Sequence, residues 1–512
     1  MRKVLIANRG EIAVRIIRAC REMQISPVAV YSECDRRALH VRYADEAYLL
    51  GPSAPRDSYL RIDRILDAAK RSGAEAVHPG YGFLAENEDF AAAVRDAGLI
   101  FIGPTAEAVA LMGSKTAARE LARQAGVPVV PGTAEPLGSD VPDDEVARVA
   151  AGIGYPLLVK AVSGGGGKGM RTVTSPADLA SAVRAARSEA GTAFGDPAVF
   201  LERQILRPRH IEVQLLADHY GTVLPFVERE CSIQRRHQKV VEETPSLAVT
   251  PEQRAAITSA AAAVARAAGY TNAGTIEFLL DEDGKFYFLE MNTRLQVEHP
   301  ITEMVSGVDL VRWQIRIARG EHLTLDPARL LTPQGHAIEC RIYAEDPDNN
   351  FLPSPGRIEH LRVPSGPGIR DDSGATVGLD VPIFYDPIVS KLIAWAEDRP
   401  SAVARMQRAL REYILLGIKS TVPFFSWLLA QPEFQDGRFH TTYLDEVLKA
   451  RNGQPFSEPD AATDEIAVVA AAVQAALAPR GMNGSRQPSA MPGVAVAPGT
   501  RWKSHARNEG LR

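Results

Sequence analysis

Two glutamates are spaced so that they can face each other across a β-hairpin. Glu277 and Glu290 lie in apolar, strand-like runs that flank Asp283-Gly284, a dipeptide typical of a tight hairpin turn. If these two residues form the turn, Glu282 lies opposite Lys285, and counting outward places Glu277 opposite Glu290. A four-residue turn would make the two acids diagonal neighbours on one face. Opposed carboxylates repel unless a cation lies between them, and oxygen ligands favour Mg²⁺ or Mn²⁺. The hairpin therefore predicts a divalent-metal site, the alternative being two solvated acids on an exposed face.

Polar residues continue after Glu290 with the period of a β-strand. In an extended chain, residues at every second position point to the same side. Met291, Leu295 and Val297 between them would supply the packed side. At about 3.3 Å per residue, the two ends of this polar series are too far apart to hold one small group. We therefore expect metal and phosphate at the first end and a second small substrate at the other. The polar series comprises Glu290, Asn292, Arg294, Gln296 and Glu298.

A glycine-rich loop precedes this region in the chain. The loop Gly164–Gly169 can approach phosphate groups closely, because glycines present backbone N–H groups without side chains. It is not a Walker A loop, since neither serine nor threonine follows Lys168. Lys160 ends the apolar run Leu157–Lys160 and would place a cation beside the loop. The alternative for Lys160, and equally for Lys115, is a surface lysine whose charge extends into water.

The N-terminal part of the chain alternates strand-like and helix-like segments, and these are the first of the elements that must position the site residues. Short apolar runs that alternate with amphipathic helices predict a parallel sheet covered on both faces, similar to a Rossmann unit. Its first turn, Asn8–Glu11, has a single glycine, whereas the dinucleotide fingerprint needs three, so NAD binding is disfavoured. A linking helix is expected over Ala106–Ala125. The expected strands are Lys3–Ala7, Val28–Tyr31, Ala76–His78 and Leu99–Ile102, and the first helix is Glu11–Met23.

Composition excludes several classes of protein. The 512 residues include 58 Lys and Arg against 63 Asp and Glu, a net charge of -5, which argues against a nucleic-acid binder that works through bulk charge. The four cysteines are scattered, as expected of reduced thiols in the cytoplasm. Charged residues interrupt the N-terminal sequence MRKVLIANRGEIAVRII, which disfavours a signal peptide. No stretch approaches the roughly 18 apolar residues of a membrane span. We expect a cytoplasmic protein without membrane or nucleic-acid partners.

At this point the chain resembles a known family. The lysine at a strand end, the glycine-rich loop and the hairpin with two acids are similar to an ATP-grasp ligase. Longer strings resemble biotin carboxylase, the subunit that carboxylates biotin within acyl-CoA carboxylases. The resemblance runs from Arg2 to about Leu448. It is carried by IANRGEIA (Ile6–Ala13), HPGYGFLAEN (His78–Asn87), RHIEVQ (Arg209–Gln214), ERECSIQRRHQKVVEE (Glu228–Glu243), EMNTRLQVEHPITEM (Glu290–Met304), FLPSPG (Phe351–Gly356) and YDPIVSKL (Tyr385–Leu392).

The resemblance implies roles for residues at matching positions. Glu298 would be the base that deprotonates bicarbonate, and Arg341 would stabilise the enolate of biotin beside Tyr81. Glu277, Glu290 and Asn292 would hold Mg²⁺ or Mn²⁺, with two ions expected. Bicarbonate would be bound by Lys239, Arg294, Gln296, Val297 and Glu298. ATP would be bound by Lys115, Lys160, Gly165, Gly166, Gly167, Met170, Glu202, His210, His237 and Leu279.

The implied fold is α/β, an ATP-grasp domain between two further modules. The N-terminal Rossmann-like domain would span residues 1–113 and the ATP-grasp domain 114–332, with a glycine-rich lid subdomain at about 131–203. A C-terminal α+β module would cover 333–448. A linker helix and a tail predicted to be disordered would complete the chain over 449–512.

The sequence contains no methionine followed by lysine, the pair that marks a biotin-bearing domain, and leaves no length for a carboxyltransferase. We therefore expect biotin on a separate carrier protein and carboxyltransferase subunits as partners, and the family implies a homodimer. The final acceptor, which could be acetyl-CoA, propionyl-CoA, another acyl-CoA or pyruvate, stays open. The rival hypotheses are another ATP-grasp ligase, such as a carbamoyl-phosphate or purine-pathway enzyme, and a non-catalytic nucleotide-binding scaffold.

Some reactive side chains have a structural interpretation. Cys231 is predicted to be a small packed side chain, and His78 and His299, each before a proline, are predicted to be structural. Arg203 stands where many relatives have lysine, which leaves the adenine side of the ATP site less well defined.

Overall fold

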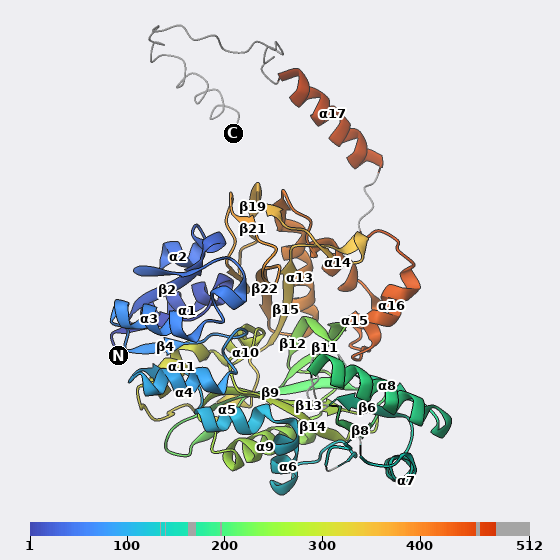
Figure 1. The fold of residues 1–512 in the computed structure, drawn as a ribbon. Helices are drawn as coiled ribbons and strands as arrows, with labels where there is room; N and C mark the ends of the chain where they lie inside the picture. The colour runs from blue at the N-terminus through green and yellow to red at the C-terminus, as the bar shows by residue number, and fades with distance from the viewer. Residues whose placement is uncertain (134, 139, 162–169, 195–196, 457–460, 478–512) are drawn as a thin grey trace. The chain divides into compact units, whose positions relative to one another are not determined.

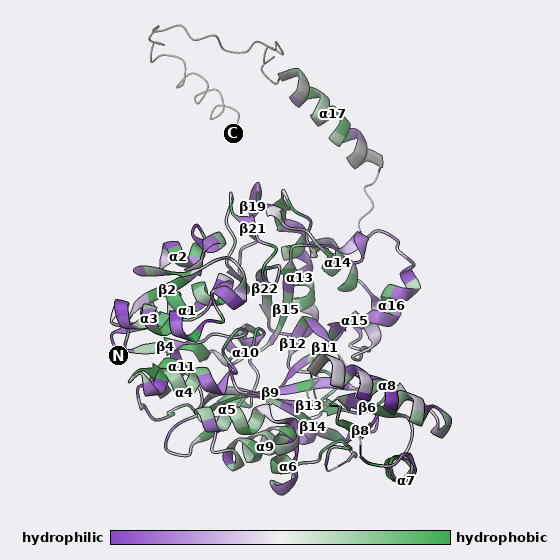
Figure 2. Cartoon of the chain, in the orientation of Figure 1, coloured by the Kyte–Doolittle hydropathy of each residue, from purple (hydrophilic) through white to green (hydrophobic). Residues whose placement is uncertain are grey.

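The computed structural model describes residues 1–133, 135–138, 140–161, 170–194, 197–456 and 461–477 (Figure 1). The chain divides into two units, residues 1–457 and 458–512. In the second unit, helix α17 (Ala461–Leu477) is described and is largely hydrophobic (Figure 2). Among the residues described, no helix has the length and apolar character needed to cross a lipid bilayer. The predicted phosphate loop with Gly165, Gly166 and Gly167, and the predicted tail beyond residue 477, lie outside the described residues.

The N-terminal part is the predicted parallel sheet, coloured blue in Figure 1. Alternation along its central strand explains the two covered faces: Val4 and Ile6 pack in one core with helix α1, and Leu5 packs in another with helices α3 and α4. The strand order is β3-β2-β1-β4-β5. The elements are β1 (Lys3–Ile6), α1 (Gly10–Glu22), β2 (Ser26–Ser32), α2 (Leu39–Tyr43), β3 (Glu46–Gly51), α3 (Ile62–Ser72), β4 (Ala76–His78), α4 (Glu88–Asp96) and β5 (Ile100–Phe101).

The chain order reverses beside β1, and β1 pairs in parallel with β4, so the loops that follow these two strands lie at the same edge of the sheet. Asn8 follows β1, and its side-chain amide donates to the carbonyl oxygens of Pro79 and Tyr81, both at 2.8 Å. This edge therefore fixes the loop that carries Tyr81.

The predicted linking helix is two helices, α5 (Ala106–Gly113) and α6 (Lys115–Gln124). The prediction of one continuous helix over Ala106–Ala125 is wrong because Ser114 has extended backbone angles and its hydroxyl accepts a hydrogen bond from the N–H of Ala117. Serine is a strong N-cap residue, so it starts a new helix here. The break places Lys115 at the first position of α6.

A small antiparallel sheet follows, with strand order β7-β6-β8. Its strands are β6 (Leu157–Ala161), β7 (Met170–Val173) and β8 (Val199–Arg203), and helices α7 (Asp143–Ile153) and α8 (Pro176–Phe194) pack against them. Lys160 lies opposite Phe200, and Leu158 lies opposite Glu202, so strands β6 and β8 bring Lys160 and Glu202 close together.

The central sheet joins two of the predicted modules. Its order is β14-β13-β9-β11-β12-β15-β22-β20, with β10 paired to β9. Because β12 pairs with β15, the C-terminal module extends the sheet of the ATP-grasp part without a break. The strands are β9 (Arg209–Ala217), β10 (Val223–Pro225), β11 (Arg229–Arg235), β12 (Gln238–Thr244), β13 (Asn272–Leu280), β14 (Phe286–Asn292), β15 (His336–Tyr343), β20 (Ile369–Ser373) and β22 (Ile388–Ala396).

Helices cover this sheet and fill its two cores. Helix α9 (Pro251–Ala267) packs on β9 and β10, and α13 (Arg399–Glu412) packs on β15 and β22. The remaining helices of this part are α10 (His299–Ser306), α11 (Leu310–Ala318), α12 (Pro327–Leu330), α14 (Val422–Leu428), α15 (Pro432–Gln435) and α16 (Tyr443–Arg451). Short strands complete it: β16 (Glu345–Asp346), β17 (Leu352–Pro353), β18 (Gly356–Arg357), β19 (His360–Arg362), β21 (Asp380–Val381) and β23 (Ile414–Leu416).

Candidate active site

Strands β13 and β14 form the predicted hairpin, and Glu277 lies opposite Glu290. The turn differs from the prediction. The backbone N–H of Asp281 donates to the carbonyl of Lys285 at 2.8 Å, so the loop consists of Glu282, Asp283 and Gly284. Gly284 has φ +78°, the left-handed conformation that closes a three-residue hairpin loop. The expected pairing of Glu282 with Lys285 is therefore wrong.

A second irregularity restores the opposition of the two acids. On the loop side, Phe278 pairs with Phe288, whereas the next pair outward is Glu277 with Glu290, so Leu289 is an extra residue on β14. Such a β-bulge shifts the register by one residue. The offsets of the loop and the bulge cancel, and this cancellation leaves Glu277 and Glu290 where a regular two-residue hairpin would have placed them.

The polar series does not stay extended. Strand β14 ends at Asn292, and the chain then bends and turns at Val297 and Glu298 before α10 begins at His299. The expectation that the chain stays extended from Glu290 to Glu298 is therefore wrong beyond Asn292. The amide groups of Asn292 and Gln296 donate to the same oxygen of Glu277, at 2.8 and 3.3 Å.

Lys239 on β12 joins three acids. Its partly buried ammonium lies 2.5 Å from Glu212, 2.8 Å from Glu277 and 2.7 Å from Glu298. Burial acts to lower the pKa of Lys239, but the three carboxylates outweigh it and hold that pKa well above its ordinary value. Lys239 therefore stays a cation and connects the hairpin to the end of the polar series.

Glu298 is fully buried between two cations. One carboxylate oxygen contacts Lys239, and the other accepts a hydrogen bond from Arg341 at 2.9 Å. Burial acts to raise the pKa of Glu298, but Lys239, Arg341 and Arg229 hold it well below its usual range. The side chain is thus ionised, the state that a proton acceptor needs.

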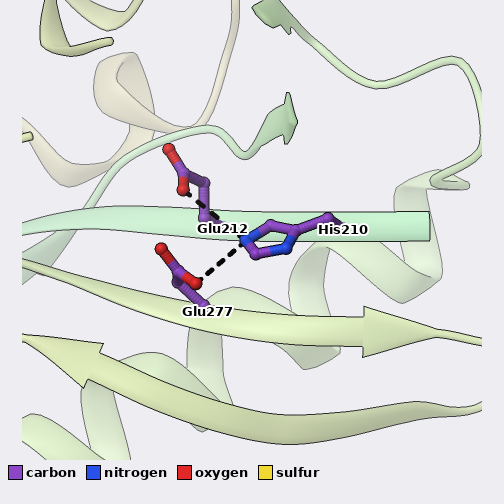
Figure 3. A group of neighbouring side chains, drawn as sticks. All are labelled: His210, Glu212 and Glu277. Atoms are coloured by element: carbon purple, nitrogen blue, oxygen red, sulfur yellow. Dashed lines mark ion pairs between the residues drawn. The ribbon is translucent and has the colours of Figure 1, made fainter. Parts of the chain in front are cut away.

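Glu277 and Glu290 offer a donor set that fits a divalent cation. Loss of water contact and then the charge of Glu277 raise the pKa of Glu290, although its side chain is open to the cavity. A cation between the two acids would relieve this repulsion, and their oxygens, with that of Asn292, suit Mg²⁺. His210 lies on the other side of Glu277, with its Nε2 3.0 Å from that carboxylate and 4.0 Å from Glu212 (Figure 3).

One cavity of about 500 Å³ connects these groups, within the range of small-molecule sites. At one end Lys160 and Arg119 both pair with Glu202, and at the other Glu298 meets Arg341. Every predicted metal and bicarbonate residue lines it, as do the described ATP residues and Arg341. The predicted residues in the lining are Lys115, Lys160, Met170, Glu202, His210, His237, Lys239, Leu279, Glu277, Glu290, Asn292, Arg294, Gln296, Val297, Glu298 and Arg341.

His237 reaches the cavity from a strained turn. Arg235 pairs with Gln238, so Arg236 and His237 form a two-residue hairpin loop with φ +50° and +65°. Positive φ angles are uncommon for residues other than glycine, and strain of this kind gathers at functional sites.

Tyr81 does not line this cavity. Its hydroxyl lies 3.5 Å from the ammonium of Lys391, which also donates to the carbonyl oxygen of Val297 at 3.0 Å. Tyr81 is therefore one side chain away from the turn that carries Glu298.

The predicted structural residues have structural contacts. Burial raises the pKa of the Cys231 thiol well above its ordinary value. The ring of His78 accepts a hydrogen bond from the N–H of Gly80, and Nδ1 of His299 donates to the carbonyl of Gln296 at 2.8 Å. None of these three residues lines the cavity.

Sequence reasoning missed several residues of the site. Glu212 is fully buried, pairs with Arg229 and lies opposite Glu277 on the neighbouring strand β9. Its signal was the alternation of His210, Glu212 and Gln214 in RHIEVQ, where only His210 was assigned. Arg119 beside Glu202, Glu86 beside Arg294 and Glu242 beside Arg341 had no comparable signal, because they come from distant parts of the chain.

Comparison with known proteins places this site in a family. Three family models match in order: "Biotin carboxylase, N-terminal domain" over residues 1–109, "Carbamoyl-phosphate synthase L chain, ATP binding domain" over 114–326, and "Biotin carboxylase C-terminal domain" over 339–446. The biotin carboxylase of Nostoc sp. is 52% identical over 87% of this chain and 99% of its own length. The chain belongs to the biotin carboxylase family. The carbamoyl-phosphate model covers the ATP-binding part alone, so the flanking domains decide against that rival.

Other biotin carboxylase relatives serve different carboxylases. A pyruvate carboxylase subunit of Methanothermobacter thermautotrophicus is 53% identical over 87% of this chain and 89% of its own length. The biotin carboxylase domain dimer of the 2-oxoglutarate carboxylase from Hydrogenobacter thermophilus, in complex with MgADP, ADP and bicarbonate, matches with a TM-score of 0.83, 48% identity, and coverage of 90% of this chain and 99% of that one. Biotin carboxylase from Campylobacter jejuni matches with a TM-score of 0.83 and 44% identity over 87% of this chain and 98% of that one. The predicted ATP-grasp fold and the assignment to ATP-dependent carboxylase ligases are confirmed.

Proposed function

We propose that this chain uses ATP and bicarbonate to carboxylate biotin on a separate carrier protein, as the first half-reaction of an acyl-CoA carboxylase. The observation that carries the proposal is the pair of cations around Glu298. Lys239 and Arg341 keep this acid ionised at one end of a cavity whose other end holds Lys160 and Arg119. A base and a phosphate-binding region thus share one cavity.

The first step we propose is the activation of bicarbonate. Bicarbonate is a poor nucleophile, so Glu298 would remove its hydroxyl proton while an oxygen attacks the γ-phosphorus of ATP. Cations offset the charge that develops, and Lys239 and Arg294 would supply them, with Gln296 and Val297 as further contacts. ADP leaves and carboxyphosphate forms. His210, His237, Lys115 and Lys160, with Met170, Glu202 and Leu279, would hold ATP.

Glu277, Glu290 and Asn292 would hold Mg²⁺ or Mn²⁺. An ion bound there would neutralise phosphate oxygens during the transfer. The direct opposition of Glu277 and Glu290 across the hairpin supports a cation at this position.

In the second step, carboxyphosphate breaks down to carbon dioxide and phosphate beside biotin. The ureido nitrogen of biotin attacks carbon dioxide only as an enolate-like anion, so the phosphate released from carboxyphosphate would take its proton and a permanent cation must lie near it. Arg341 suits this role because a guanidinium stays charged. Tyr81 would line the biotin side.

The partners we propose are a biotin carrier protein, carboxyltransferase subunits and a second copy of this chain. The relative in complex with MgADP and bicarbonate is described as a dimer, which supports the last. Pyruvate is the second candidate for the final acceptor, because a pyruvate carboxylase subunit is 53% identical. The cytoplasmic location stays a prediction.

The test is ADP release by the purified chain with bicarbonate, with and without free biotin. We expect release that biotin stimulates, and incorporation of labelled bicarbonate into an acid-labile carboxybiotin. ADP release that is independent of biotin but increases with an amine acceptor would overturn the proposal.

A further inference from the structure

Lys391 is a fully buried lysine on β22 to which the proposed reaction gives no role. Its ammonium contacts three other residues. It donates to the carbonyl oxygen of Val297 at 3.0 Å, lies 3.2 Å from a carboxylate oxygen of Glu11, and lies 3.5 Å from the hydroxyl of Tyr81. The ammonium is also 5.5 Å from the centre of the Tyr81 ring, within range of a cation–π contact.

These partners come from three separate parts of the chain. Glu11 lies in the first turn of α1, and Tyr81 follows β4 in the N-terminal sheet. Val297 lies in the turn before α10, at the end of the polar series. Lys391 itself belongs to the predicted C-terminal module. One ammonium thus connects the two outer modules to the turn of the candidate active site.

The contact with Val297 bears directly on Glu298. The carbonyl of Val297 belongs to the peptide group that joins Val297 to Glu298. The preceding carbonyl, that of Gln296, accepts a hydrogen bond from His299. Side chains therefore hold both carbonyls before Glu298, and the one next to it depends on Lys391.

Stability alone gives little reason for this buried pair. Burial raises the pKa of Glu11 to about 7 even though Lys391 opposes the shift. The ion pair between Glu11 and Lys391 therefore does not offset the free-energy cost of burying its two charges. Buried ion pairs of this kind can be replaced by apolar residues of similar size with neutral or favourable effect on stability. A positional role explains better why a charge stands at this point.

We propose that Lys391 is a positioning residue for the carboxylation reaction, which fixes the backbone of Glu298 and the ring of Tyr81 relative to each other. The inference rests on the proposed function and deepens it. By holding Val297 and Tyr81 at once, Lys391 sets the distance between the base that activates bicarbonate and the side chain proposed to line the biotin pocket.

The main test is Lys391→Met, assayed by steady-state kinetics with MgATP, bicarbonate and biotin varied in turn. Misplacing a reacting group by about 1 Å can lower a rate on the order of 100-fold. We therefore expect kcat to fall by about that factor, with KM for ATP within about twofold of wild type, because the ATP residues do not contact Lys391. A kcat within about twofold of wild type would overturn the inference.

A control variant separates position from packing. Arg399→Met removes another buried cation of the same module, which donates to Glu243 at 2.7 Å and contacts neither Val297 nor Tyr81. We expect this variant to unfold at lower temperature but to keep kcat within about twofold. An equal loss of kcat in Arg399→Met and Lys391→Met would show a merely structural role.

The double variant Glu11→Met/Lys391→Met covers the case in which Lys391→Met fails to fold. It replaces the whole pair by apolar side chains, so we expect it to fold and to unfold near the wild-type temperature. Its kcat should stay about 100-fold low. Recovery of both stability and kcat would refute the positioning role. Wild-type turnover that is independent of biotin would instead refute the proposed function. A failure of the positioning role and a failure of the proposed function can therefore be told apart.

Discussion

Glu212 and Glu277 lie directly opposite each other on strands β9 and β13. On its other side, Glu277 faces Glu290 on strand β14. Three neighbouring strands therefore carry a row of aligned glutamates, which is unfavourable unless cations lie along it. Lys239 contacts the first two, and we propose Mg²⁺ for the second and third.

Replacing the proposed base should separate chemistry from binding. In Glu298→Gln, the side chain keeps its size but can no longer accept a proton. We expect biotin carboxylation to fall at least about 100-fold, while affinity for MgADP, measured by calorimetry, stays within about twofold. Unchanged turnover would remove Glu298 from the role.

The metal proposal predicts a change in Mg²⁺ requirement. Glu290→Gln removes one charged ligand from the hairpin, so the Mg²⁺ concentration for half-maximal activity should rise about tenfold, which corresponds to about 1.4 kcal/mol. The control is Glu282→Gln, which neutralises an exposed acid in the loop of the same hairpin. If both variants keep the wild-type Mg²⁺ dependence, the hairpin does not hold the ion. Removal of Mg²⁺ by EDTA should stop turnover in the wild type.

Arg229 is a further cation beside the row of glutamates, and we expect its role to be structural. Arg229 is fully buried and donates to Glu212, Gln214, Thr275 and Thr302. Arg229→Met leaves a buried acid without this partner, so the free energy of unfolding in urea should fall by about 3–5 kcal/mol. Arg312→Met, which breaks the exposed pair with Glu22, should change it by less than about 1 kcal/mol. Equal losses of unfolding free energy in Arg229→Met and Arg312→Met would contradict a structural role for Arg229.

Stability should depend on pH through His40. Burial lowers the pKa of this side chain to about 4 from an ordinary 6.5. Between these values the unfolded chain binds a proton that the folded chain does not, so stability is full above about pH 6.5 and falls toward pH 4. At pH 5 the loss attributable to His40 is on the order of 2 kcal/mol.

Urea unfolding at pH 7.5 and pH 5 checks this prediction in His40→Leu. The variant should lose less stability than wild type between the two values. The matched control is His219→Leu, at an exposed position, which should retain the wild-type pH dependence. If His40→Leu loses as much stability as wild type between pH 7.5 and pH 5, other groups cause the pH dependence.

The sequence predicted the fold class well, because apolar alternation and helix periodicity are local signals. The parallel N-terminal sheet and the opposition of Glu277 and Glu290 were predicted from such patterns. The opposition was right although the turn was wrong, since the loop and the bulge at Leu289 offset each other. Neither offset has a signature in a single sequence.

Local sequence patterns do not predict contacts between distant segments. Lys239 gathers Glu212, Glu277 and Glu298 from three elements, and Lys391 reaches Glu11 across 380 positions. The break at Ser114 shows a local failure of another kind. The helix pattern continues through it, and the hydroxyl of Ser114 caps the start of the second helix, α6.

Two cations, Lys239 and the proposed metal ion, would compete for the carboxylate of Glu277. Lys239 contacts it, and the ion proposed at the hairpin would draw on the same group. A Glu277 that turns toward a divalent ion leaves one N–H of Lys239 available to another anion, so the arrival of metal should tighten the hold on bicarbonate. By thermodynamic reciprocity, bicarbonate should tighten the hold on metal to the same degree. A single glutamate would thereby make the binding of the metal ion and of bicarbonate cooperative.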